Sequence, residues 1–125
     1  MVWIAIAVGG ALGSMARHGI NVLVQSRWPM MRFPLATFVV NVAGCLVIGV
    51  LAGLIMAGRI TPRLYWREFV FVGVLGGFTT FSSFGLDTIT LTRAQSVTPA
   101  MWNVIGQVVL GLLAVQAGML LTSRG

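Results

Sequence analysis

Four long apolar stretches dominate the sequence and leave little choice of fold. A helix that crosses a membrane needs about 20 mostly apolar residues, and such stretches lie at about 2–24, 33–57, 68–92 and 100–122. Short connectors rich in arginine, proline and glycine separate them. We therefore expect one all-α integral membrane domain over residues 1–125, with four transmembrane helices and both termini on the same side.

The composition excludes an ordinary soluble enzyme. Only 8% of the residues are charged and 58% are hydrophobic, whereas a soluble domain carries about a quarter charged residues. The net charge of +6 comes from arginines spread among apolar runs, so we interpret them as anchors at the membrane surface and not as a nucleic-acid site. The single cysteine, Cys45, excludes an internal disulfide, and we interpret it as a packing residue.

The arginines are almost equally divided between the two expected sides of the membrane. The side with the termini and the second connector carries four, namely Arg59, Arg63, Arg67 and Arg124. The other side carries three, Arg27, Arg32 and Arg93, or four if Arg17 is included. Because lysine and arginine in short loops set the orientation of a membrane protein, this balance predicts that both orientations coexist.

Four short helices bury little interior, and each carries polar or glycine positions that fit poorly against lipid. Burying these positions requires a partner chain. Two copies of opposite orientation would pair about a two-fold axis in the membrane plane. The expected architecture is therefore an antiparallel, dual-topology homodimer.

The third stretch contains a segment, residues 74–88, that is a poor helix centre. Gly76 and Gly77 are followed by threonines and serines; glycine costs about 1 kcal/mol relative to alanine in a helix, and the hydroxyls compete for backbone hydrogen bonds. We expect the third helix to be broken near its centre. Non-helical backbone at membrane depth is typical of an ion site or a pore, although the glycines alone also fit a helix-packing face.

Two phenylalanines within this segment have helical spacing. Phe81 and Phe84 are three residues apart and share a helix face, with serines beside them. The positive edge of an aromatic ring, together with hydroxyl donors, can replace part of the water shell of an anion. The alternative is that both rings pack in the core.

We find no pattern of residues that indicates catalysis. The chain has one histidine, His18, and two acidic residues, Glu68 and Asp87, without a nucleophile motif. We therefore expect that the protein is not an enzyme. The roles of His18 and Asp87 stay open, because an acid within the membrane is either functional or paired with an arginine.

The run GGFTTFSSF at residues 76–84 resembles the signature of the Fluc (CrcB) fluoride channels. The resemblance extends over the whole chain and includes residues 9–13 with Arg17 in the first stretch and residues 41–44 in the second. It implies a passive, fluoride-selective channel that exports cytoplasmic fluoride through two pores of a dual-topology homodimer. It also implies a structural sodium ion at the centre, no organic cofactor, and a place in the bacterial cytoplasmic (inner) membrane.

The resemblance also assigns roles to particular residues. Main-chain carbonyls of Gly76 and Thr79 would hold the sodium ion. The side chains that would line the fluoride pores are Asn41, Phe81, Ser83 and Phe84.

The fourth stretch departs from this family, which tends to have a track of hydroxyl side chains there. This chain has the amides Asn103, Gln107 and Gln116 instead. Asn103 and Gln107 share a helix face, and their amide groups could donate to an anion in the fluoride pore or bond between helices. Arg17 has two interpretations as well: it lies in an aqueous vestibule that attracts anions, or it anchors the helix at the interface.

A second class of protein also fits the size and the predicted topology. Small multidrug antiporters are four-helix, dual-topology dimers that need a membrane acid to exchange protons for cations. The first stretch has no acid, which leaves Asp87 as the candidate. We keep a proton-coupled multidrug antiporter as the alternative function.

Overall fold

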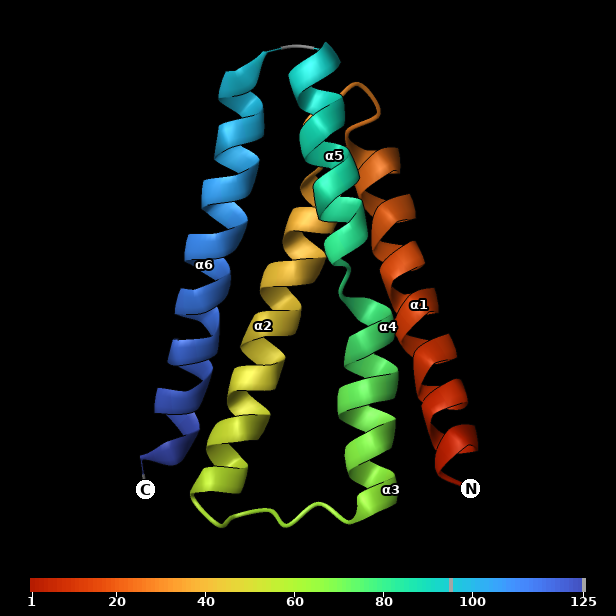
Figure 1. Cartoon of the computed structure of the whole chain (residues 1–125), viewed down its shortest axis with the longest axis vertical. Helices are drawn as coiled ribbons and strands as arrows, with labels where there is room; N and C mark the ends of the chain where they lie inside the picture. The colour runs from red at the N-terminus through yellow and green to blue at the C-terminus, as the bar shows by residue number, and fades with distance from the viewer. Residues whose placement is uncertain (95, 125) are drawn as a thin grey trace.

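The computed structural model describes residues 1–94 and 96–124, which are helical apart from short connectors. The elements are α1 (Val2–Arg27), α2 (Leu35–Met56), α3 (Leu64–Arg67), the π-helical η1 (Glu68–Leu75), α4 (Gly76–Phe78), α5 (Phe81–Ala94) and α6 (Val97–Ser123). The chain runs alternately up and down through α1, α2, the broken segment from α3 to α5, and α6 (Figure 1). Both termini lie at the same end, as the sequence predicts.

Three segments of the described chain are long and apolar enough to cross a membrane: Leu35–Met56, Leu64–Ala94 and Val97–Ser123. They correspond to the second, third and fourth predicted stretches. α1 is also long, with 26 residues, but it is not among the three, because Arg17, His18 and Asn21 interrupt its apolar sequence. Its length fits the predicted first span, while its composition alone does not establish one.

The predicted break in the third helix is present. α4 ends at Phe78, α5 begins at Phe81, and Thr79 between them has extended backbone angles (φ −83°, ψ 156°). Figure 1 shows the break about halfway along the molecule. The helical segment before the break is π-helical over most of its length, a geometry that is rare and often marks functional sites.

Glycines bring the helices into close contact in two places. α1 packs on η1 and α4, and α2 packs along α6. A Cβ atom on Gly73 would lie 2.9 Å from the Cα of Gly9, and one on Gly118 would lie 2.6 Å from the Val50 amide nitrogen. Without a hydrophobic driving force in lipid, such close backbone packing is what holds membrane helices together.

The interior of the single chain is small, and most large apolar side chains point outward. The buried apolar residues are Val40, Leu75, Leu91 and Ala100. By contrast, Leu112 and Leu121 on α6 are 68% and 73% exposed. Apolar side chains exposed along long helices are suited to contact with lipid or with a partner chain.

Candidate functional site

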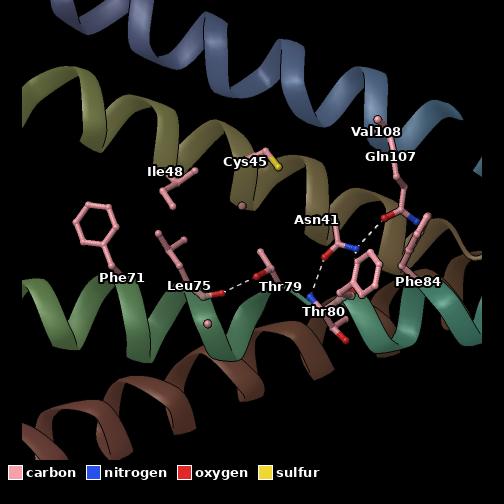
Figure 2. Close-up of a pocket in the computed structure, with 13 residues that line it drawn as sticks. Asn41, Cys45, Ile48, Phe71, Leu75, Thr79, Thr80, Phe84, Gln107 and Val108 are labelled. Carbon is pink, nitrogen blue, oxygen red and sulfur yellow. Dashed lines mark hydrogen bonds between the residues drawn. The ribbon is translucent and has the colours of Figure 1, made fainter. Parts of the chain in front are cut away.

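A cavity of about 400 Å³ lies at the break in the third helix. Its walls come from α2, from η1 and α4, from the start of α5 and from α6, as Figure 2 shows. Six of the residues that the sequence associates with an ion pathway line the cavity: Asn41, Gly76, Thr79, Phe81, Phe84 and Gln107. The remaining wall is mostly apolar and includes Cys45, Ile48 and Leu75.

Asn41 on α2 binds the backbone at the break through both atoms of its amide. The Thr80 N–H donates to Asn41 Oδ1 at 2.9 Å, and Asn41 Nδ2 donates to the Thr80 carbonyl at 3.1 Å. In an unbroken helix the Thr80 N–H would instead donate to the Gly76 carbonyl. Asn41 therefore replaces the helical acceptor that the Thr80 N–H loses at the break, and Figure 2 shows this pairing.

Thr80 also caps the start of α5. Its Oγ1 accepts the Ser83 N–H at 3.2 Å and donates to Ser83 Oγ at 3.1 Å. A threonine that accepts the N–H three residues later is a favourable N-cap. The positive end of the α5 dipole is thereby fixed within the body of the molecule, beside the cavity.

The backbone before the break presents oxygen atoms to the same region. The Thr79 N–H and hydroxyl both donate to the Leu75 carbonyl, at 3.0 and 2.9 Å. The Gly76 carbonyl has lost its usual helical donor to Asn41. Gly76 and Thr79 both line the cavity, so the C-terminal end of α4 lies beside it.

The two aromatic rings named by the sequence lie together at the cavity. The ring centroids of Phe81 and Phe84 are 5.5 Å apart and the rings are tilted by 40°. Phe84 is partly buried, whereas Phe81 is 83% exposed in the single chain. Phe81 is therefore not a core residue of this chain, contrary to the interpretation that both rings pack inside.

The amides of α6 bond between helices, and one of them also reaches the cavity. Asn41 Nδ2 donates to Gln107 Oε1 at 2.7 Å, and Gln107 Nε2 donates to Asn103 Oδ1 at 2.9 Å. Gln107 lines the cavity, while Asn103 is fully buried behind it and is not part of the lining. Gln116 is exposed on α6, away from this group.

Two further predicted residues lie outside the cavity. Ser83 is turned toward Thr80 and is not part of the lining. Arg17 is partly buried on α1 and lies ten residues before the end of that helix at Arg27, which is about 15 Å along the axis. This is deeper than the sequence suggests, because α1 continues to Arg27 and not to about residue 24.

Asp87 lies farther along α5, at a different place from the cavity of Figure 2. Its Oδ2 atom is buried without a hydrogen-bond partner in the described part of the chain. Arg32 shares a neighbouring cavity of about 330 Å³ with it. Sharing a cavity is not an ion pair, so the pairing of Asp87 with an arginine stays a prediction.

Comparison with known proteins places the chain in a family. The family model described as "CrcB-like protein, Camphor Resistance (CrcB)" matches residues 4–119. The chain belongs to the CrcB-like family. This membership and the three apolar helices identify this CrcB-like protein as a multi-pass membrane protein.

Curated relatives of this CrcB-like protein match over almost their whole length. A protein of Paracoccus denitrificans is 49% identical over 117 residues, which cover 94% of this chain and 90% of the relative. A protein of Solibacter usitatus is 44% identical over 124 residues, which cover 99% of this chain and 100% of the relative. Both are named "Fluoride-specific ion channel FluC". These names give no support to the multidrug antiporter alternative.

One feature of the site is missing from the sequence-based prediction. The sequence indicates a break but does not indicate that Thr80 lies at its centre. In the structure the Thr80 N–H donates to Asn41, and the Thr80 hydroxyl accepts the Ser83 N–H. Threonine is a favoured residue at a helix N-cap, but the sequence does not single out Thr80 from its neighbour Thr79. The long-range partner, Asn41, has no local signal, because it lies 39 residues away on another helix.

Proposed function

We propose that this protein is a fluoride-selective channel through which fluoride leaves the cell passively, down its electrochemical gradient. The observation that supports this best is the cavity at the helix break, where amide groups and two phenylalanine rings meet. The relatives named as fluoride-specific channels support the choice of ion.

The chemistry of the cavity suits a small anion. The lining includes the Gln107 amide and the rings of Phe81 and Phe84, and it includes no arginine. Amide N–H groups and the positive edges of aromatic rings can replace water around an anion. A pathway built from such weak donors lets the ion leave again, as conduction requires.

A homodimer of oppositely oriented copies would complete this site. The exposed Phe81 ring and the many exposed apolar side chains of α6 need cover from lipid or protein. The arginine balance of four against three or four supports insertion in both orientations. In this proposal α1 crosses the membrane as the fourth span, and the two copies create two pores related by a two-fold axis.

The residues at the end of α4 fit a structural sodium ion. Sodium prefers oxygen ligands, and unwound carbonyls at the C-terminal end of a half-helix are typical sites for it. The Gly76 carbonyl, freed from its helical donor, and the carbonyl of the extended Thr79 supply such ligands beside the cavity. Two oxygens from one chain are too few for a cation shell, so a second copy would supply the rest. Bound there, sodium would neutralise the negative end of α4 and stabilise the interface.

Arg17 has a supporting place in this proposal. A partly buried arginine on a helix facing an aqueous vestibule raises the local concentration of anions through its field. We place the channel in the bacterial cytoplasmic membrane, where the outward fluoride gradient would drive export.

The test is efflux from liposomes that contain the purified protein. They are loaded with potassium fluoride or potassium chloride and diluted into an anion-free buffer with a potassium ionophore, and an ion-selective electrode records the anion released. Rapid fluoride efflux with chloride retained is the expected result. Retention of both ions by a folded, reconstituted protein would reject the proposal. Empty liposomes and liposomes with Phe81→Ile protein are the matched controls.

A further inference from the structure

A continuous line of hydrogen bonds connects the helix break to the backbone carbonyl of Phe84. From Asn41 it passes to Gln107 at 2.7 Å, to Asn103 at 2.9 Å and to Thr88 at 3.0 Å. The Thr88 hydroxyl then donates to the Phe84 carbonyl at 2.8 Å. We call the side chains of Asn41, Gln107, Asn103 and Thr88 the amide relay. It links three helices, α2, α6 and α5.

The direction of every bond in the amide relay is fixed by one backbone group. The Thr80 N–H can only donate, so the oxygen of Asn41 must face it. The nitrogen of Asn41 then faces Gln107, which must turn its own oxygen toward Asn41 and its nitrogen toward Asn103. The same reasoning orients Asn103 toward Thr88. Reversing one amide would place two donors or two acceptors face to face.

A count of amide hydrogens then separates the roles of Asn41 and Gln107. Asn41 Nδ2 has two hydrogens, and it donates to the Thr80 carbonyl and to Gln107 Oε1. Both are used, so Asn41 has none left for an ion. Gln107 Nε2 donates one hydrogen to Asn103, which leaves its second for the cavity that Gln107 lines.

We propose that Gln107 is the side-chain amide that donates to the anion, and that Asn41 and Asn103 are positioning residues that hold it in the donating orientation. This inference rests on the proposed fluoride channel and deepens it. Asn103 is fully buried and outside the cavity lining, so it acts through Gln107. Burying an amide costs free energy of desolvation unless its donors and acceptors form hydrogen bonds. The amide relay supplies those hydrogen bonds to Asn103 and Gln107.

The experiment compares three α6 variants in fluoride and chloride efflux from liposomes. Gln107→Met removes the donor with little change in length, and Asn103→Leu removes only the positioning group. Gln116→Met, at an exposed position on the same helix, is the matched control. We expect the first two variants to lower the ratio of fluoride to chloride efflux by at least about tenfold. Gln107→Met removes a hydrogen bond to a charged ion, and Asn103→Leu removes the acceptor that holds the Gln107 amide in the donating orientation. The control should keep the ratio of the unaltered protein.

The double variant distinguishes the amide relay from two independent effects. If Asn103 acts through Gln107, Gln107→Met with Asn103→Leu should lower the ratio no further than Gln107→Met alone. A purely structural role for Asn103 predicts less stable protein with an unchanged ratio, and that result would overturn the proposal. Multiplied effects of the two substitutions would overturn it as well.

Two controls keep the outcome decisive. If Asn103→Leu protein does not fold, Thr88→Val removes the hydroxyl that binds Asn103 with little change in volume, and the ratio should fall in the same direction; an unchanged ratio would count against the amide relay. The unaltered protein is measured first. Its failure to release fluoride rejects the proposed function, whereas normal efflux with unchanged ratios in all variants rejects only the amide relay.

Discussion

Asn41 and Thr80, 39 residues apart in the chain, are joined by two hydrogen bonds of 2.9 and 3.1 Å between one side-chain amide and the backbone N–H and carbonyl of one residue. The pair substitutes for helical bonding at the point where the third helix is interrupted. A break within a membrane is tolerated only where the freed backbone groups find such partners. The stability of the break therefore depends on a residue of a different helix.

The first prediction concerns this pair. Asn41→Ala should lower the free energy of unfolding by about 1–3 kcal/mol, because the partly buried Thr80 N–H loses its acceptor. Thermal unfolding in detergent micelles, followed by circular dichroism, measures the change. Asn21→Ala on α1 is the matched control, since Asn21 is exposed. If the two variants have the same free energy of unfolding, Asn41 is not needed to stabilise the break.

The second prediction concerns the ring pair. Phe81→Ile and Phe84→Ile should each slow fluoride efflux by about tenfold, equivalent to about 1.4 kcal/mol on the barrier, while the helical content stays normal. The exposed Phe81 contributes little to folding of the single chain. Leu86→Ile, at a 69% exposed position of the same helix, should leave efflux unchanged. Normal efflux in both phenylalanine variants would remove the rings from the pathway.

The third prediction tests close helix packing. Gly118→Ala should destabilise the protein by about 1–3 kcal/mol, because its Cβ would lie 2.6 Å from a backbone nitrogen of α2. Gly19→Ala on α1 meets no atom within 4 Å and should be neutral or stabilising by up to about 1 kcal/mol. The melting temperatures of the two variants in the same detergent give the comparison. A Gly118→Ala protein as stable as Gly19→Ala would contradict the packing of α2 on α6.

The fourth prediction concerns orientation. The double substitution Arg63→Gln and Arg67→Gln reduces the four arginines at the end with the termini to two, against three or four at the other end. The population should shift toward copies with the termini outside the cytoplasm. Paired C-terminal reporters, one active inside and one active outside the cytoplasm, measure the shift. The unaltered protein should activate both reporters, and activation of only one would reject dual insertion.

Local sequence signals were sufficient to predict much of the fold. The apolar stretches predicted the helices to within a few residues, since hydropathy and length act over neighbouring positions. Gly76, Gly77 and the hydroxyl residues after them predicted the break because their effect on a helix is local. The four helical passes and the shared side of the termini follow from the same signals, although the composition of α1 is less apolar than its length suggests.

Only the tertiary structure showed which residues meet at the break. Residue spacing does not reveal these hydrogen bonds. Asn41 bonds to Thr80 and Asn103 bonds to Thr88 across different segments of the chain, and only the bond from Gln107 to Asn103 lies within one helix. The spacing of Asn103 and Gln107 placed them on one face but left open whether they bond or face a cavity, and the structure shows that Gln107 does both. Residue types determined that donors and rings exist, whereas the packing of α2, α5 and α6 decided their orientation, since hydrogen bonds depend on positions that only the folded chain defines.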